Sequence, residues 1–433
     1  MPLFRNANVT NPKQRLDPFN ERLFPYYAGY STTFVERLLE SLMIENDSVV
    51  FDPWNGSGTT VLVATRMGLK SIGIDLNPVM VIVAKASFVS ATEVNSLVPI
   101  AQSLIERSQA RNKKGLADDP LSKWLFPEST GIIRQLEFEI NQTLVSRDCY
   151  APLTSKTELD RLAPLGAFFY LALFRTGRCL LKDFVPTNPT WVKFPQCPQL
   201  RKRPSSSMIY RTFIGEVRNL VRCLAGSNYL DSEEKRGSFI IRLDNAERLS
   251  LPDASVNFVV TSPPYCTRID YAVATAIELA ILRFSTSLFD QLRRSLMGTS
   301  TVKADAGLAS SLLGTTCSRF LDAVYNHPSK ASRTYYFKNH LQYFESLQLA
   351  IQELVRVLTL NGLCVLVVQD SYYKDIHNDV PTIITEMASH SGMILRRRQD
   401  FIANRSMVGV NNRAKQYCCA RKIVESVLCF ERT

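Results

Sequence analysis

The sequence has few of the residues that bind metals and no stretch long enough to cross a membrane. None of its ten cysteines stands in a C-x-x-C pair, and its four histidines lie far apart, so the spacings typical of zinc sites are absent. Scattered cysteines favour a reducing compartment. No apolar run reaches the ~18–20 residues of a membrane-spanning helix, and the start of the chain lacks the apolar core of a signal peptide. We therefore expect a soluble, cytoplasmic protein with no metal site and no membrane partner.

The composition is that of a globular protein with an acidic partner. The chain has 433 residues, of which 45% are apolar and 21% charged. That is enough for one large domain with insertions, or for two to three domains. The formal net charge is +11 and the pI is about 9.2. An excess of positive charge favours nucleic acid as the partner, ahead of an anionic membrane surface.

An apolar stretch at residues 256–260 runs directly into Thr-Ser-Pro-Pro-Tyr at 261–265. The apolar stretch predicts a buried strand. Each proline fixes its own φ and biases the preceding residue towards an extended conformation, so the carbonyls of Ser262 and Pro263 cannot join a helix. Two stiffly held acceptors beside the Tyr265 ring suit a planar base with an exocyclic amine. A proline-rich turn with no such role has the same local pattern.

A second strand end lies upstream. Residues 48–60 predict a short buried strand, a glycine-rich turn and the start of a helix, and a further strand at 71–74 ends at Asp75. This order is half of a doubly wound α/β sheet. Gly56 and Gly58 let the backbone approach a ligand closely. Asp75 can accept hydrogen bonds from both hydroxyls of a ribose.

The turn lacks the residues that bind a pyrophosphate. The third glycine of the dinucleotide pattern is replaced by Val61, and there is no Gly-Lys-Ser/Thr sequence. We therefore expect an adenosine-type ligand without a pyrophosphate. A β-α-β turn with incidental glycines is the alternative, but this turn lies between two strand-end carboxylates, Asp52 and Asp75.

A basic region interrupts the α/β pattern. Residues 96–235 predict a mainly helical insertion with aromatic residues among many lysines and arginines. Most of these charges are expected on solvated faces, but together they are candidates for phosphate contact and target recognition. The candidates within it are Arg175, Arg178 and Lys193.

The α/β pattern resumes after the insertion, which divides the chain into residues 1–95, 96–235 and 236–433. A strand at 239–243 ends at Asp244, a candidate acceptor for an adenine amino group. Residues 285–335, rich in Ser, Thr, Gly and Ala, predict an irregular segment. Two further segments, 393–400 and 424–430, are expected to pair as an antiparallel hairpin that closes the sheet.

Two of these motifs resemble those of amino-directed DNA methyltransferases, which use S-adenosylmethionine. Residues 52–60 look like the family's cofactor motif, and residues 261–265 are similar to its catalytic motif in the form associated with cytosine-N4 enzymes. Residues 24–31 resemble the element that covers the methionine end of the ligand. The resemblance covers roughly residues 20–95, 236–285 and 340–433. It implies a doubly wound, mostly parallel seven-stranded sheet of the Rossmann-like methyltransferase type, interrupted by the insertion.

The resemblance also implies roles for individual residues. Ser262 and the Pro263 carbonyl would grip the amine of a base flipped out of the duplex, Tyr265 would stack on it, and Asp52 would bind the amino group of the cofactor. The catalytic candidates are Ser262, Pro263, Pro264 and Tyr265. The candidates for binding S-adenosylmethionine are Tyr27, Asp52, Asn55, Gly56, Gly58, Thr59, Thr60, Asp75, Asn77, Asp244 and Thr261, and Arg268 is a further candidate for contact with DNA.

The function expected from the resemblance is methyl transfer to cytosine N4 in a specific sequence of double-stranded DNA, in the cytoplasm at the nucleoid. A cognate restriction endonuclease is a further partner that it implies. Three alternatives stay open: an adenine-N6 DNA methyltransferase, an RNA base methyltransferase, and a non-catalytic nucleic-acid-binding protein that keeps the fold. The sequence does not specify the oligomeric state.

Overall fold

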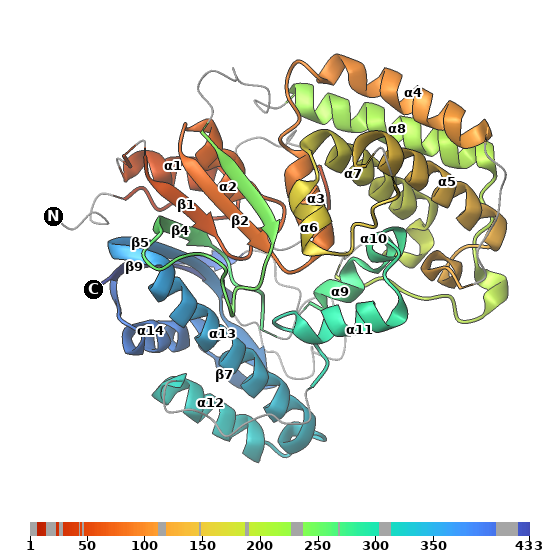
Figure 1. The fold of residues 1–433 in the computed structure, drawn as a ribbon. Helices are drawn as coiled ribbons and strands as arrows, with labels where there is room; N and C mark the ends of the chain where they lie inside the picture. Colours follow the sequence, from red (N-terminus) through yellow and green to blue (C-terminus); the bar gives the residue numbers. More distant parts are fainter. Residues whose placement is uncertain are drawn as a thin grey trace.

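A seven-stranded mixed sheet organises the protein (Figure 1), in the order β3-β2-β1-β4-β5-β9-β8. The computed structural model describes residues 7–13, 23–25, 29–42, 44–45, 47–110, 118–146, 149–186, 190–226, 237–266, 269–302, 313–403 and 423–433. Along the sheet, the neighbouring strands β3, β2, β1, β4 and β5 pair in parallel. Strand β9 pairs antiparallel with β5, and β8 pairs antiparallel with β9. The expected doubly wound, mostly parallel sheet with a closing hairpin is confirmed. The strands are β1 (Val49–Asp52), β2 (Lys70–Asp75), β3 (Phe239–Leu243), β4 (Val256–Thr261), β5 (Leu358–Gln369), β8 (Met393–Ala403) and β9 (Ile423–Arg432), with a separate small hairpin of β6 (Ser371–Tyr373) and β7 (Ile376–Asn378).

Alternate residues of the central strands face two different cores, because side chains of a strand point to opposite faces of a sheet. Val50 and Val260 pack against helices α1 (Thr32–Ser41) and α2 (Thr59–Arg66), whereas Phe51 and Val259 pack on the opposite face. The helices of that opposite face are α12 (Thr315–Asn326), α13 (Phe337–Val357) and α14 (Val380–His390).

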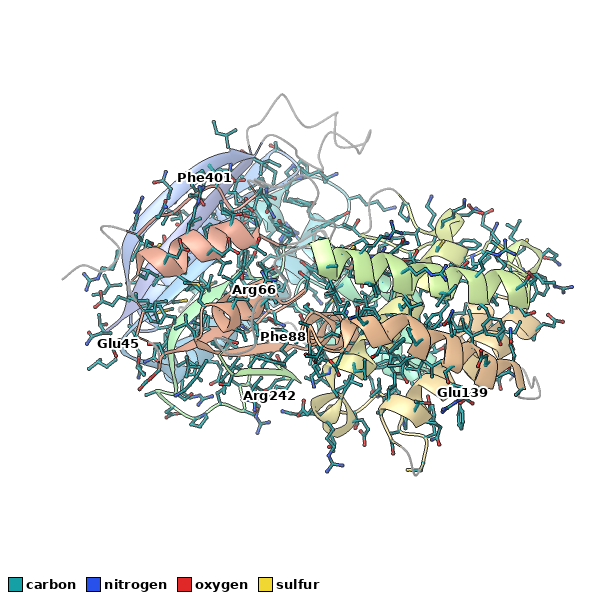
Figure 2. The ribbon with its side chains drawn as sticks, turned by 90° about the horizontal axis from the view of Figure 1, so that it is seen from above. Glu45, Arg66, Phe88, Glu139, Arg242 and Phe401 are labelled. Carbon is teal, nitrogen blue, oxygen red and sulfur yellow. The ribbon has the colours of Figure 1, made fainter. Side chains whose placement is uncertain are left out.

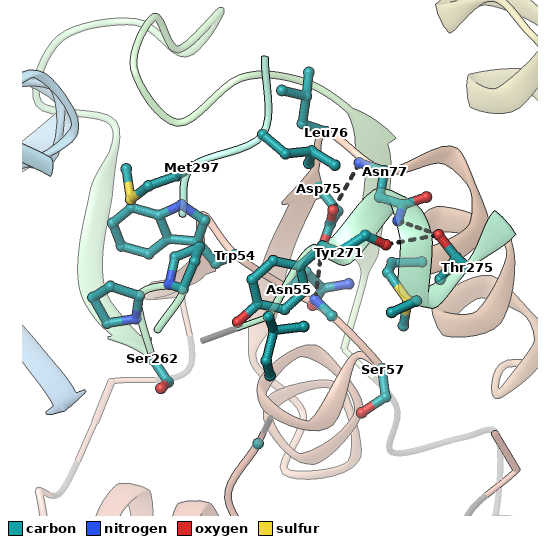
Figure 3. A pocket seen from close by; sticks show the side chains of 18 of the residues that line it. Trp54, Asn55, Ser57, Asp75, Leu76, Asn77, Ser262, Tyr271, Thr275 and Met297 are labelled. Atoms are coloured by element: carbon teal, nitrogen blue, oxygen red, sulfur yellow. Dashed lines mark hydrogen bonds between the residues drawn. The ribbon is translucent and has the colours of Figure 1, made fainter. Parts of the chain in front are cut away.

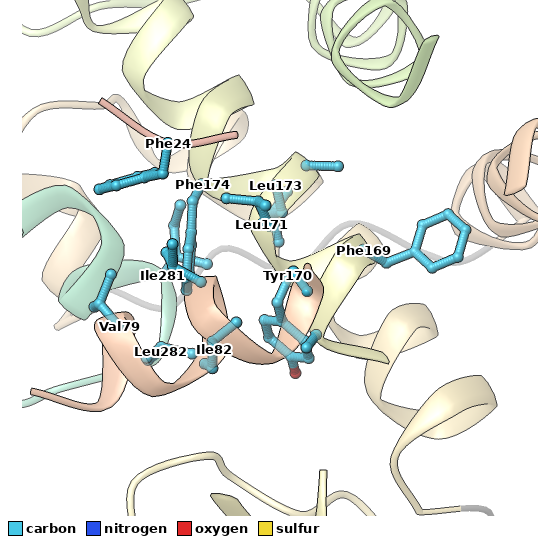
Figure 4. Close-up of a cluster of buried hydrophobic side chains, with 14 of the residues drawn as sticks. Phe24, Val79, Ile82, Phe169, Tyr170, Leu171, Leu173, Phe174, Ile281 and Leu282 are labelled. Atoms are coloured by element: carbon cyan, nitrogen blue, oxygen red, sulfur yellow. The ribbon is translucent and has the colours of Figure 1, made fainter. Parts of the chain in front are cut away.

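The region between α3 (Pro78–Ala86) and β3 is helical, and its core is continuous with α3 and with residues 272–284. Figure 2 shows this helical part beside the sheet, with Glu139 on its far side and Phe88 close to the junction. Its centre is α7, whose residues from Gly166 to Phe174 are all buried, and Figure 4 shows Tyr170 and Phe174 of α7 packed near Ile82 of α3. The helices are α4 (Val94–Ala110), α5 (Pro127–Leu144), α6 (Lys156–Arg161), α7 (Pro164–Leu180) and α8 (Ser206–Gly226), with short 3₁₀ turns at Pro120–Lys123, Lys182–Phe184 and Pro198–Leu200.

The helical part is joined to the sheet by buried charged groups. Lys85 of α3 donates from Nζ to the carbonyl oxygens of Leu159 (2.7 Å) and Leu162 (3.0 Å) around the end of α6. Arg134 of α5, which is paired with Asp119 inside the helical part, donates from Nη2 to the carbonyl oxygen of Ala280 (2.5 Å), beyond β4 in the chain. Because a buried charge needs a partner, these contacts fix how the helices sit on the sheet.

The prediction that residues 285–335 are irregular is wrong in two places. After α9 (Tyr271–Ala274) and α10 (Ala276–Ile281), helix α11 (Thr286–Ser295) begins at a Ser285 cap that accepts from Leu288 N. Helix α12 buries an apolar stripe of Cys317, Phe320, Leu321 and Val324. Ser285 serves as a cap, and Thr286, Ser287 and Thr315 lie on exposed faces of these helices. No described helix is both long enough and apolar enough to span a membrane.

Candidate active site

The carboxyl ends of β1, β2 and β4 meet at one pocket. Because β1 lies between β2 and β4 in the sheet, the turns that follow these three strands are neighbours at the same edge, which is where doubly wound sheets bind ligands. The pocket brings together the two motifs that the sequence analysis singled out (Figure 3). Its lining includes Asp52, Asn55, Gly56, Thr59, Asp75 and Asn77 from the β1 and β2 ends, and Ser262, Pro263 and Pro264 from the β4 end.

Asp52, at the end of β1, is buried and links the two motifs. Its Oδ1 accepts from the Thr261 hydroxyl (2.6 Å) and from Trp54 N (3.1 Å). Its Oδ2 accepts from the Tyr30 hydroxyl at 3.0 Å. Burial raises the pKa of Asp52 to about 6, and these hydrogen bonds oppose the rise. The carboxyl therefore changes protonation close to neutral pH.

Asp75, at the end of β2, holds the glycine-rich turn in place. Its Oδ2 accepts from Gly56 N (3.0 Å), and its Oδ1 accepts from Asn77 N (2.8 Å). Burial raises the pKa of Asp75 to about 6, and the nearby charge of Asp52 adds to the increase. Two carboxyls that both resist ionisation favour a ligand that offers hydrogen-bond donors or positive charge.

The turn itself requires its glycines. Gly56 and Gly58 have φ of 49° and 85°, the left-handed region that glycine adopts freely. A Cβ added at Gly58 would lie 2.9 Å from Ala84 Cβ of α3. Thr60 follows and donates from Oγ1 to the Val260 carbonyl at 3.0 Å, which ties the start of α2 to the end of β4.

Asn55 is the one side chain of the turn whose polar atoms lack partners. It is 4% exposed and lines the pocket, yet both Oδ1 and Nδ2 are buried without a hydrogen bond. An unsatisfied buried amide costs roughly 1–3 kcal/mol per group. In Figure 3 it lies beneath Tyr271, beside Asp75. A polar ligand in the pocket would satisfy these two atoms.

The end of β4 offers acceptors held by the chain itself. The described residues make no hydrogen bond to the Ser262 or Pro263 carbonyl, and the Pro264 carbonyl accepts from the Tyr343 hydroxyl at 2.8 Å. Tyr265 does not line the pocket, but its backbone N donates to the Tyr271 hydroxyl at 3.2 Å. Its own hydroxyl accepts from Lys13 Nζ at 3.3 Å.

Several residues of the site were not found from the sequence. Tyr271 lines the pocket between the strand ends and is partly buried, and this burial raises its pKa. Tyr30 contacts Asp52, Thr60 and the Val260 carbonyl with one hydroxyl. Trp54 and Met297 lie side by side at the pocket (Figure 3). The only sequence signal was that Tyr30 and Trp54 stand within the motifs; Met297 belongs to the segment predicted as irregular.

The structure places other predicted residues away from the roles expected of them. Asp244 is not part of the pocket lining, because its Oδ2 accepts from the Ser250 hydroxyl (2.5 Å) and from Ser250 N (3.2 Å). Asn245, Ala246 and Glu247 line the pocket instead. Tyr27 and Arg268 lie outside the described residues.

The two predicted phosphate-binding arginines of α7 are held in ion pairs. Arg175 Nε lies 2.6 Å from Glu216 Oε2. Arg178 is 9% exposed, is paired with Glu278, and lines the pocket rather than an outer surface. A guanidinium in these surroundings is poorly placed for a duplex phosphate, so the expected role does not fit Arg178. Lys193 is exposed, as a phosphate contact requires.

The described residues fit an adenosyl ligand with an amino-acid tail. The pocket offers carboxylates for hydroxyl or ammonium groups, a glycine turn for close approach, and the unpaired amide of Asn55. It offers no phosphate cradle with a lysine. This donor and acceptor set matches S-adenosylmethionine, and Asp52, Asn55, Gly56, Asp75 and Asn77 are the residues that would hold it.

Fold and site together define a protein with an α/β methyltransferase-like architecture. Residues 5–86 match the N6_N4_Mtase family, described as DNA methylase. This segment contains the glycine-rich turn and Asp75, and the Thr261–Tyr265 motif lies beyond it.

Two curated proteins are similar to parts of the chain. The Type II methyltransferase M.BsoBI of Geobacillus stearothermophilus is 24% identical over 283 residues, which cover 62% of this chain and 54% of that protein. The Type II methyltransferase M.MjaII of Methanocaldococcus jannaschii is 29% identical over 101 residues, which cover 23% of this chain and 18% of that protein. The chain thus spans about half the length, or less, of these relatives. The matched family is described as DNA methylase, and the printed names of both relatives are those of Type II methyltransferases.

Proposed function

We propose that the protein is an S-adenosylmethionine-dependent DNA methyltransferase that modifies the exocyclic N4 amine of cytosine. The observation that carries the proposal is the shared pocket, in which Asp52 and Asp75 from two strand ends lie with Ser262 and Pro263 from a third. A ligand held by the first pair would face a base held by the second.

The residues around the glycine-rich turn have the chemistry to hold the cofactor. Asp75 would accept the ribose hydroxyls, Asp52 the amino group, and the backbone at Gly56 and Gly58 would lie close to the tail of the ligand. When bound, S-adenosylmethionine supplies a methyl group made electrophilic by a sulfonium. The Asn55 amide would satisfy its two unpaired atoms on the same ligand.

The residues at the end of β4 would prepare the base. The cytosine amine is a poor nucleophile because its lone pair is delocalised into the ring. The carbonyl of Pro263 and the side chain or carbonyl of Ser262 would accept its two N–H groups, which favours a tetrahedral nitrogen and localises the lone pair. After methylation the nitrogen loses one of these protons without a strong base, and Tyr265 stacking would offset part of the few kcal/mol that base flipping costs.

The exposed surface near residues 190–203 is the proposed contact for the duplex. Thr190 lines the pocket, and next to it Trp191 and Phe194 are 46% and 45% exposed. Exposed Lys193 and Arg203 lie in the same segment. Basic side chains among exposed aromatic rings are typical of nucleic-acid-binding surfaces. Because Arg175 and Arg178 are engaged in ion pairs, we assign the phosphate contacts of the insertion to this segment, which includes the candidate Lys193.

Nucleoside mass spectrometry of DNA from cells that express the protein tests the proposal and separates its alternatives. N4-methylcytosine is the expected product, and N6-methyladenine would assign the adenine alternative. Methylation only of RNA would favour an RNA enzyme. No modified base, despite calorimetric binding of nucleic acid, would favour a non-catalytic binding protein.

The printed names of both relatives are those of Type II methyltransferases, which supports a restriction endonuclease as a functional partner at the nucleoid. Resistance of the modified DNA to one endonuclease, read together with the modified sequence, would test that part.

A further inference from the structure

A single arginine from the helical part reaches the pocket formed by the sheet. Arg178 lies near the end of α7 and is the one cation among the described residues that line the pocket. The charged groups that line the pocket with it are the carboxylates Asp52, Asp75 and Glu247. The sequence suggested phosphate contact for this arginine, but its position calls for a different partner.

Two of the three guanidinium nitrogens of Arg178 are engaged. Nε pairs with Oε1 of Glu278, which is fully buried, and Nη2 lies 3.2 Å from Glu278 Oε2 and 2.7 Å from the Ala274 carbonyl oxygen. Nη1 is buried and has no hydrogen-bond partner. A guanidinium presents its N–H groups in a fixed fork, so the groups on Nη1 keep a set direction and need an acceptor from elsewhere.

The surroundings keep the guanidinium in place. The Phe24 ring packs on it, with the ring centroid 4.9 Å from Cζ, and Figure 4 shows Phe24 close to Phe174 of α7. One turn earlier in α7, Arg175 Nη1 donates to the Leu23 carbonyl at 3.0 Å. The segment that carries Phe24 also lines the pocket. Arg178 is therefore held between that segment and α10, without freedom to turn towards solvent.

We infer that Arg178 binds the α-carboxylate of the methyl donor, so that the helical insertion completes the cofactor site. The inference rests on the proposed function. A zwitterionic amino-acid tail needs one anionic and one cationic partner, and the pocket offers carboxylates for the ammonium and only Arg178 for the carboxylate. Hydrogen bonds between a guanidinium and a carboxylate are charge-assisted and among the strong ones in proteins.

The test compares two ligands that differ only in the carboxylate. Isothermal titration calorimetry would measure S-adenosyl-L-homocysteine and its decarboxylated analogue against the wild type and Arg178→Met. The wild type should prefer the carboxylate-bearing ligand by about tenfold or more. Arg178→Met should lose about 10- to 100-fold in affinity for S-adenosyl-L-homocysteine and almost none for the decarboxylated analogue.

Two further variants guard against a fault in folding. Arg178→Met/Glu278→Gln removes the buried pair as a unit, since a lone buried Glu278 is costly, and should show the same selective loss. Arg283→Met is the matched control: Arg283 also pairs with a buried glutamate, Glu137, at 2.8 Å and packs on a ring, Tyr150, at 4.6 Å, but does not line the pocket. It should leave both affinities unchanged.

Equal losses for both ligands, or no loss for either, would overturn the assignment of Arg178 while leaving the proposed function intact. A wild type that binds neither ligand would reject the methyl-donor site and the Arg178 assignment together.

Discussion

The two sides of the pocket, one formed by the neighbouring ends of β1 and β2 and the other by the end of β4, are held by different means. On the first side, Asp52 of β1 and Asp75 of β2 accept hydrogen bonds from Tyr30, Thr261 and backbone N–H groups. At the end of β4, two prolines hold the chain, and the described residues make no hydrogen bond to the carbonyls of Ser262 and Pro263. The first side is held rigid by hydrogen bonds to its carboxylates. The second side is held rigid by its prolines, and its two carbonyl acceptors stay available for a ligand.

This difference separates the two tasks proposed for the pocket. A cofactor site benefits from a closed network that fixes the carboxylates before the ligand arrives. A site that grips an amine needs acceptors that no protein donor has taken. The comparison predicts that replacing the glycines or the hydrogen-bonding side chains around β1 lowers the stability of the protein and its affinity for the cofactor. Substitutions at the β4 end should leave stability and affinity nearly intact and should slow methyl transfer.

The largest effect is expected from Gly58→Val. Its φ of 85° is unfavourable for a branched side chain, and the new Cβ would lie 2.9 Å from Ala84 Cβ. Urea unfolding should show a loss of about 3 kcal/mol or more. Gly215→Ala, in α8 with nothing within 4 Å of the new Cβ, is the control and should gain about 0.5–1 kcal/mol. Equal behaviour of the two variants would refute the rigid turn.

A smaller loss is expected when the link between the strand ends is cut. Tyr30→Phe removes the hydroxyl that lies 3.0 Å from Asp52 Oδ2 and 3.1 Å from the Val260 carbonyl. The free energy of unfolding should fall by about 1–3 kcal/mol, and the pKa of Asp52 should rise further. Tyr325→Phe, at a ring 39% exposed, should change stability by less than about 0.5 kcal/mol. A free energy of unfolding equal to that of the wild type would show that the Tyr30 hydroxyl does not stabilise the junction between the two strand ends.

The pH dependence distinguishes stability from binding. Asp52 and Asp75 have pKa values raised to about 6, above those of the unfolded chain. Their contribution to stability is thus fully present below the unfolded pKa of about 4 and is lost as pH rises through 6. Affinity for S-adenosyl-L-homocysteine should move the other way and fall as pH drops from 7 to 5, because a protonated carboxyl binds an ammonium poorly.

Asp52→Asn should flatten the part of this affinity profile that belongs to Asp52. Calorimetry between pH 5 and 8 would measure it. An affinity of the wild type that is constant across this range would contradict the proposed pairing of the carboxylates with the ligand.

The smallest effect is expected from Tyr271→Phe. It removes the acceptor of the Tyr265 backbone N–H, 3.2 Å away, and should cost about 1 kcal/mol in transition-state stabilisation, a several-fold slower transfer. Cofactor affinity should stay within about twofold. If affinity falls while the transfer rate of the bound enzyme holds, Tyr271 belongs to the β1 side of the comparison.

The parts of the fold that repeat a short pattern were predictable from the sequence. Apolar runs followed by Asp52 and Asp75 gave the parallel strands, and the stretches at 393–400 and 424–430 gave the closing hairpin. Helix α12 was missed because its polar residues mask a stripe of four apolar ones. Short polar residues indicate loops and helix caps equally well.

The site was predictable only where residues are adjacent in sequence. The glycine turn and Ser-Pro-Pro-Tyr each carry a local signal. Tyr271 and Arg178 act through contacts with distant residues, and no local pattern records such contacts. For the same reason, the position of Asp244 after a strand could not predict that its carboxylate accepts hydrogen bonds from Ser250 instead of lining the pocket.

The central claim is that the ends of β1 and β2 hold the cofactor and the end of β4 holds the base. Its most direct test measures cofactor affinity and single-turnover methyl transfer to duplex DNA in two variants, Asp75→Ala and Tyr265→Ala. Asp75→Ala should bind cofactor about 10- to 100-fold more weakly. Tyr265→Ala should bind it within about threefold of wild type and transfer methyl groups about 10- to 100-fold more slowly. Transfer at the wild-type rate by Tyr265→Ala, or unchanged cofactor affinity in Asp75→Ala, would contradict the claim.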